Sequence, residues 1–202
     1  MENEINRWYK KLWETKGARF ISANRLELHD KWSTITLSVV SVYIITLNLT
    51  ILLENRPGIF SNGNITFSTI CLSILLLVLS LIQSSRNYKI RASKYHECGR
   101  KIDDLYNKVC IWKHTDASPS IDDLKNINIE YLKLLDNYEN HKQIDYSLFM
   151  SNNLSDYKEK IRCKLSFWLY VKIWYNFTTV WVYWSVLLIP LLTYLITRNP
   201  SA

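Results

Sequence analysis

Three long stretches without a charged side chain constrain this 202-residue chain more than any other feature. They cover residues 33–53, 57–85 and 173–197. Each is long enough to cross a bilayer, which takes about 20 apolar residues in a helix. The chain holds only four glycines and four prolines, which leaves little turn chemistry for a many-stranded sheet. We therefore expect an all-α membrane protein.

The uncharged stretches divide the chain into four regions. Residues 1–32 are expected to form an N-terminal amphipathic helix, 33–85 a transmembrane helical hairpin, and 86–172 a cytoplasmic helical region. Pro57, Gly58 and Gly63 lie in the hairpin linker. Residues 173–197 form a third apolar membrane segment, which is long enough to span despite Pro190. Tryptophan and tyrosine crowd its first half, so a segment lying at the interface is the alternative.

The expected N-terminal helix has an apolar face, and basic residues lie between the apolar positions in the sequence. Ile5, Trp8, Tyr9, Leu12 and Trp13 recur at helical spacing. Such a face suits a helix at the membrane surface, with its basic side chains on anionic lipid heads. It suits equally a helix that packs on the central region.

Basic residues near the ends of the hairpin predict its orientation. Seven precede the first span, one lies in the turn, and six follow the second span. Under the positive-inside rule, the N-terminus and the central region are cytoplasmic. The six could also contact anionic lipid or a polyanionic partner, in keeping with a formal net charge of +7. Residues 86–172 carry 16 basic and 12 acidic residues, so direct nucleic-acid binding is not expected. The six are Arg86, Lys89, Arg91, Lys94, Arg100 and Lys101.

Helical periodicity continues after the second span, so we expect that span to run on as one helix to about His114. The next helix is expected to start near Ser120, which can act as its N-cap, and Pro119 can take a place in its first turn. Asp122 and Asp123 then lie near the N-terminus of the helix, where negative charge is favourable. The apolar stripe predicted for the helix before this start is Tyr95, Cys98, Ile102, Leu105, Val109 and Trp112. The stripe predicted after it is Ile121, Leu124, Ile127, Tyr131, Leu134, Leu135 and Tyr138. A final helix is predicted from Leu154, Tyr157, Ile161, Leu165 and Trp168 on one face.

The sequence carries no recognisable enzyme motif. There is no phosphate-binding glycine loop, nucleophile elbow or zinc-protease motif. The four histidines and four cysteines are scattered, without the spacing of metal ligands. We expect no catalytic residue, metal or cofactor.

Each span of the hairpin carries a stripe of polar side chains along one edge. In lipid, such residues either bond to neighbouring helices and to their own carbonyls, which is the commoner use, or line a water path in an oligomer. In the second case, Ile45 and Leu77 interrupt the stripes and are candidates for a hydrophobic gate, although ordinary packing explains them too. The pore-lining candidates are Thr34, Ser38, Ser41 and Asn48 on the first span, and Thr66, Thr69, Ser73 and Ser80 on the second.

A set of motif positions lies on both sides of the hairpin: Arg19, Arg25 and Leu26 before it, Arg91, Ala92 and Tyr95 after it, and Asn140, His141, Asp145 and Tyr146 later. Together these residues resemble the SLATT family of two-transmembrane effector domains, and within it the variant found beside reverse transcriptases. The resemblance covers about residues 15–170.

The resemblance implies an effector of antiphage defence in the bacterial inner membrane. Such an effector would form a homo-oligomeric gated pore that permeabilises the membrane. It would respond to a separate sensor, second-messenger synthase or reverse transcriptase. The rival hypothesis is a membrane-anchored helical scaffold that binds a cytoplasmic partner without forming a pore.

Overall fold

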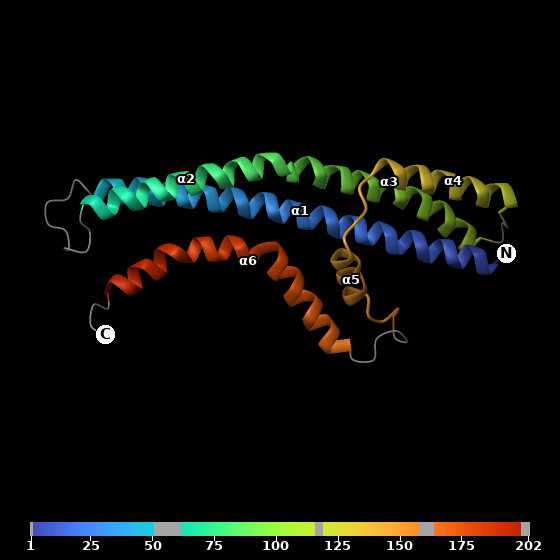
Figure 1. Ribbon diagram of the computed structural model, residues 1–202. Coiled ribbons are helices and arrows are strands. Elements are labelled where there is room, and N and C mark those ends of the chain that lie inside the picture. Colours follow the sequence, from blue (N-terminus) through green and yellow to red (C-terminus); the bar gives the residue numbers. More distant parts are fainter. Residues whose placement is uncertain (1, 51–61, 116–118, 158–163, 199–202) are drawn as a thin grey trace. The chain divides into compact units, whose positions relative to one another are not determined.

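The computed structural model describes residues 2–50, 62–115, 119–157 and 164–198 (Figure 1). The helices in these ranges are α1 (Glu2–Thr50), α2 (Asn62–Arg86), α3 (Tyr88–His114), α4 (Ile121–Asn137), α5 (Gln143–Asn152) and α6 (Lys164–Arg198). These residues include no strand, which confirms the all-α prediction. Most of the hairpin linker, including Pro57 and Gly58, lies outside the described residues, as does Ile161.

The chain folds into two compact units. The first unit contains residues 1–27 and 89–176, and the second contains residues 28–88 and 177–202. Helices α1 and α6 each contribute to both units, whereas α2 belongs to the second unit and α4 and α5 belong to the first.

The core of the first unit joins α1, α3 and α4. Ile5 and Leu12 of α1 are buried in one cluster with residues of α3 and with Ile127 and Tyr131 of α4. The α3 members include Cys98, Ile102, Leu105 and Val109, as the periodicity predicted. Of the two arrangements open for the N-terminal helix, the structure therefore has the one in which its apolar face packs on the central helices. Ile5 and Leu12 of that face are buried, and Trp8, Tyr9 and Trp13 are half-buried.

Helix α4 begins with a reciprocal capping box at the predicted cap. The Ser120 hydroxyl accepts a hydrogen bond from the Asp123 amide, and the Asp123 carboxylate accepts one from the Ser120 amide. Pro119 precedes the cap, so its predicted place in the first turn was wrong. The predicted stripe was also wrong at Ile121, which is exposed at the first helical position.

The prediction of one final helix with Leu154 and Tyr157 on it was wrong. Helix α5 ends at Asn152, and turns follow as far as Tyr157. The side chain of Asn153 donates to the Phe149 carbonyl. This bond supplies a donor for one of the last carbonyls of the helix. The Tyr157 hydroxyl donates to Glu14 of α1 at 2.7 Å, and its ring is buried. Tyr157 therefore lies in a turn and contacts α1. Leu165 and Trp168 belong to α6.

A single residue interrupts the helix predicted to continue from the second span. Asn87 has φ of 48° and separates α2 from α3, so the prediction of an unbroken helix was wrong there. Asparagine tolerates this left-handed conformation better than most residues. The predicted end at His114 is confirmed.

Two glycines inside helices of the first unit permit close packing. A Cβ added at Gly17 of α1 would collide with the ring of Phe149 from α5. A Cβ at Gly99 of α3 would lie 2.9 Å from the ring of Phe20. Glycine destabilises a helix interior by about 1 kcal/mol relative to alanine, but here it makes room for an aromatic ring.

Two helical stretches in the described part of the chain are long and apolar enough to cross a membrane. They lie within Glu2–Leu49 and Thr66–His114. Only 17% and 6% of their most apolar windows are buried inside the chain, whereas the core helix of a soluble protein would be mostly buried. The third apolar segment lies in α6, and its crossing of the membrane stays a prediction.

Candidate functional site: a polar-striped hairpin and a buried polar cluster

The polar stripes of the hairpin lie mostly outside the packed interior of the second unit. Of the eight predicted pore-lining residues, Thr69 is buried and Ser41 is half-buried, while the other six are exposed. The buried face of this part of α1 is formed by Ser33, Thr36 and Val40, which point to a different side of the helix from the stripe. The stripe is therefore available to a neighbour other than α2 and α6.

Most hydroxyls of the stripes donate to the carbonyl one turn earlier. Ser38 donates to Thr34, Ser41 to Leu37, and Ser73 to Thr69, at 2.7–3.0 Å. These bonds satisfy the donors locally and leave the hydroxyl oxygens available as acceptors. Thr34 also accepts a hydrogen bond from the Gln83 amide at 2.9 Å, which ties α1 to α2. One stripe residue thus takes part in helix packing, the commoner of the two uses.

The two gate candidates are exposed apolar side chains. Ile45 is 59% exposed and Leu77 is 60% exposed. Neither is packed inside the chain, so each faces lipid or another molecule.

The six basic residues after the hairpin do not form one cluster. Arg91 bonds Glu139, with Nη2 at 2.7 Å from Oε2, and this lowers the pKa of that carboxyl. Lys101 pairs with Glu97 and donates to the Tyr138 hydroxyl, and these bonds raise its pKa. The remaining four, Arg86, Lys89, Lys94 and Arg100, are exposed. The exposed residues are therefore the better candidates for contact with lipid heads.

The family-motif residues meet in a buried polar cluster of the first unit. Its centre is Asp145, fully buried near the start of α5. Arg25 of α1 donates to both of its carboxylate oxygens, at 2.7 and 3.0 Å, in the two-bond geometry that arginine forms with carboxylates. Ser22 donates to Asp145 at 2.7 Å, and the backbone amide of Lys142 donates at 3.1 Å. Asp145 thus fixes the start of α5 to α1.

A second set of bonds holds the α4–α5 connection. Arg19, fully buried on α1, donates to the Glu139 carbonyl and to the side-chain oxygen of Asn140. Tyr95 of α3 donates to the Asn140 carbonyl at 2.8 Å. The motif positions Arg19, Tyr95 and Asn140, far apart in the sequence, therefore contact one another.

Burial decides the electrostatics of this cluster. Desolvation lowers the pKa of His141, and the charge of Arg19 lowers it further, so the imidazole is neutral at pH 7. Burial also acts to lower the pKa of Arg25, but the bonds and charge of Asp145 outweigh it and the pKa is raised. Burial raises the pKa of Tyr95. The cluster therefore combines the buried Arg25–Asp145 salt bridge with the charge of Arg19 and a neutral His141.

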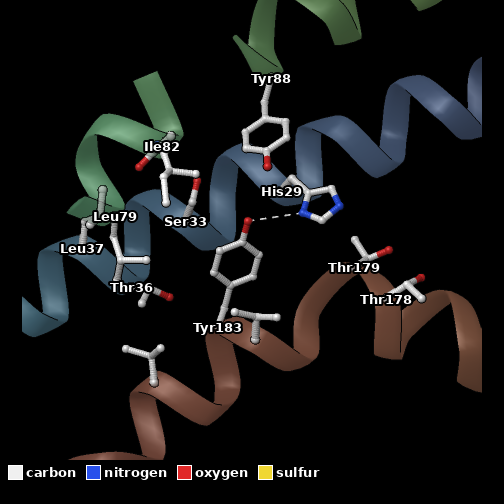
Figure 2. A pocket seen from close by; sticks show the side chains of 13 residues that line it. His29, Ser33, Thr36, Leu37, Leu79, Ile82, Tyr88, Thr178, Thr179 and Tyr183 are labelled. Atoms are coloured by element: carbon white, nitrogen blue, oxygen red, sulfur yellow. Dashed lines mark hydrogen bonds between the residues drawn. The ribbon is translucent and has the colours of Figure 1, made fainter. Parts of the chain in front are cut away.

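A pocket of about 310 Å³ lies in the second unit between α1, α2 and α6. Figure 2 shows Ser33 and Thr36 of α1, Leu79 and Ile82 of α2, and Thr179 of α6 around it. At one end, the Tyr183 hydroxyl and His29 Nδ1 share a hydrogen bond of 3.2 Å (Figure 2). The Tyr88 ring stacks on His29 with centroids 5.2 Å apart.

Several of these residues were missed from the sequence. Ser22 lies between Arg19 and Arg25 at intervals of three, so the shared helix face was a usable signal. Thr36 lies away from the polar stripe of α1, and Thr179 lies in a segment assigned no site. In the ranges that the structure covers, no group of three or more histidine, cysteine or acidic side chains could hold a metal ion.

Comparison with known protein families matches residues 1–196 to the SMODS and SLOG-associating 2TM effector domain family 5. No curated protein and no solved structure gives a significant match. The match covers almost all of the 202 residues, and the two apolar helical stretches fit a two-transmembrane domain. The chain is therefore a membrane effector and belongs to the SMODS and SLOG-associating 2TM effector domain family, the SLATT family that its motifs indicated.

Proposed function

We propose that several copies of this protein assemble in the bacterial inner membrane into a gated pore, which permeabilises the membrane during antiphage defence. The observation that carries the proposal is the exposed polar stripe on each helix of a hairpin whose apolar windows are little buried inside the chain. Polar side chains in a membrane turn toward a bundle interior or a water-filled cavity rather than toward lipid. One hairpin cannot enclose a water path, so the stripes call for further copies.

In this proposal, the apolar gate residues keep the resting pore dry. Ile45 and Leu77 lie close to the polar edge of their helices, and rings of apolar side chains close pores by dewetting. The N-terminus and the first unit lie on the cytoplasmic side, with the exposed basic residues near lipid heads. The family name points to SMODS or SLOG proteins as separate partners, and a reverse transcriptase is a further candidate.

The direct test is leakage of potassium and of a fluorescent dye from liposomes that contain the purified protein. We expect the Ile45→Ser/Leu77→Ser variant to leak much faster than the wild type, because polar rings wet more easily. The matched control is Val39→Ser/Val78→Ser. Both valines are exposed apolar residues, turned about 100 to 120 degrees from the gate residues on the same helices. Equal leakage from both variants, or tight liposomes with confirmed insertion of both, contradicts the gate.

The scaffold hypothesis keeps one specific observation in its favour. Ile111 of α3 and Ile129 and Leu132 of α4 are exposed by 48% to 61%, although they belong to the first unit. Exposed apolar residues of this kind suit a protein partner. A scaffold predicts that the gate variant binds such a partner but never leaks, so the liposome experiment separates the two functions.

A further inference from the structure

The first half of α6 turns an apolar side away from the rest of the chain. Within residues 165–176, which belong to the first unit, Val171 and Tyr175 are buried and mark the side that packs inside the chain. A surface helix of a soluble protein carries charged and polar residues on the opposite side. Here the opposite side is mostly apolar. Its apolar residues are exposed by 44% to 70%, and they are Leu165, Leu169, Tyr170, Ile173 and Trp174.

The charge of this exposed side suits the surface of an anionic bilayer. At 100° per residue, the apolar residues cover about 180° of the helix, with Leu165 at one edge and Trp174 at the other. Lys172, which is exposed, lies about 20° beyond Leu165. Ser166 and Asn176, the polar residues on this side, are uncharged, and α6 contains no aspartate or glutamate. An anionic lipid head would therefore meet a lysine and no like charge.

Two further features favour a bilayer over a protein partner as the covering surface. Tyr170 and Trp174 lie together at the edge opposite Lys172, and tyrosine and tryptophan concentrate where a membrane meets water. A lysine beside an apolar surface can lay its stem along that surface and extend its ammonium to the lipid heads. In addition, α6 continues without a loop into the rest of the uncharged stretch 173–197, which is expected to enter the membrane.

We propose that residues 165–174 of α6 form a membrane-surface helix, which inserts its apolar side at the level of the lipid heads and contacts anionic heads through Lys172. Helices with one apolar side and basic residues beside it bind membrane surfaces in this way. The contact would hold the first unit against the bilayer. It does not depend on pore formation, because a chain that never conducts would bind lipid through this helix equally well.

The test measures the surroundings of a single nitroxide label on the full-length protein in liposomes of phosphatidylcholine and phosphatidylglycerol. The label is attached at Leu169→Cys in a background with the four native cysteines replaced by alanine. Power saturation compares the collisions of the label with oxygen, which concentrates in lipid, and with a nickel chelate, which stays in water. We expect the ratio of oxygen to chelate collisions to be at least several-fold higher than at a control position in water.

Ile129→Cys on α4 is the matched control. Ile129 is exposed by 49% and Leu169 by 44%, but α4 carries charges of both signs. Equal ratios at the two positions would show that the apolar side of α6 faces water and would overturn the proposal. Few collisions with either reagent at Leu169→Cys would mean that another protein chain covers this side, and would overturn it too. A label at Ile173→Cys reports on the same side if the Leu169→Cys variant fails to insert.

Lys172 gives the test of the contact with anionic heads. In the labelled Leu169→Cys protein, Lys172→Glu should raise the collisions with the chelate several-fold in liposomes that contain phosphatidylglycerol, because anionic heads repel the new carboxylate. The effect should be clearly smaller in pure phosphatidylcholine. Lys172→Arg keeps the charge and should leave the collisions unchanged. An equal effect of Lys172→Glu in both kinds of liposome would overturn the contact of Lys172 with anionic heads.

Discussion

At the residue scale, Asp145 is the group on which most contacts of the buried cluster depend. It accepts hydrogen bonds from Arg25, Ser22 and the Lys142 amide while fully buried. The free energy needed to remove two charges from water offsets much of their electrostatic attraction, so the pair adds little net stability. Removing one partner, however, leaves the other charge unpaired in the interior.

We therefore expect Asp145→Asn to lower the free energy of unfolding of the first unit by about 3 to 5 kcal/mol, as measured by denaturant titration in detergent. Replacing both partners, in Arg25→Met/Asp145→Leu, should cost clearly less. Asp122→Asn is the control, because its pair with Lys125 is exposed and should contribute less than about 1 kcal/mol. A small loss in Asp145→Asn would mean that Arg25 reaches solvent.

His141 predicts a pH dependence of stability. Its pKa is lowered in the folded protein from the ordinary value of 6.5. As the pH falls below about 6.5, the unfolded chain takes up a proton that the folded chain does not, so stability falls until the pH also passes the lowered pKa. His141→Asn should flatten the stability profile as the pH falls below about 6.5.

Thermal unfolding across that pH range gives the measurement. His114→Asn is the control, because this exposed side chain at the end of α3 lies outside the cluster. An unchanged slope in His141→Asn would show that other groups carry the acid sensitivity.

Sequence reasoning found the members of this cluster through resemblance but not their partners. Arg25 and Asp145 are 120 positions apart, and periodicity carries no information about contacts at that separation. The pocket lining was missed for the same reason, because Thr36, Gln83 and Thr179 come from three different helices.

At the element scale, the ends of helices show what a sequence can predict. The start of α4 was predictable because Ser120 and Asp123 satisfy each other's backbone amides within four residues. The position of Tyr157 after the end of α5 was not, because its hydroxyl donates to Glu14, which lies 143 positions away. The first feature is local, whereas the second is a tertiary contact.

The space around two glycines, Gly17 in α1 and Gly63 in α2, predicts different effects for the same substitution by alanine. Gly17→Ala should destabilise the first unit by about 1 to 3 kcal/mol, because the added methyl group collides with the Phe149 ring. Gly63→Ala in α2 meets no atom within 4 Å, so it should be neutral or stabilising by at most about 1 kcal/mol. Thermal unfolding of both variants checks this pair, and a stabilised Gly17→Ala variant would contradict the close approach.

At the scale of the whole molecule, the proposed assembly predicts which faces of the hairpin meet between copies. Ser73 lies on the polar stripe of α2, whereas the free thiol of Cys71 lies two residues away and so points to nearly the opposite side. In a background with Cys98, Cys110 and Cys163 replaced by alanine, Ser73→Cys/Cys71→Ser should form disulfide-linked dimers in oxidised membranes.

The matched control keeps Cys71 as the single cysteine and should cross-link much less. Electrophoresis without reducing agent reads out the dimers. Preferential cross-linking through Cys71 would place the polar stripe away from the neighbouring copy and would contradict the proposed pore axis.

The continuity of α1 has a mechanical consequence. This one helix, Glu2–Thr50, carries both Arg25 and Ser41, with no break between them. Each turn of an α-helix is locked to the next by backbone hydrogen bonds, so twisting one end turns the other. If Arg25 is released from Asp145 and α1 rotates about its own axis, the polar stripe should therefore rotate with it. Two glycines inserted between residues 28 and 32 should make the helix flexible there and uncouple the two rotations.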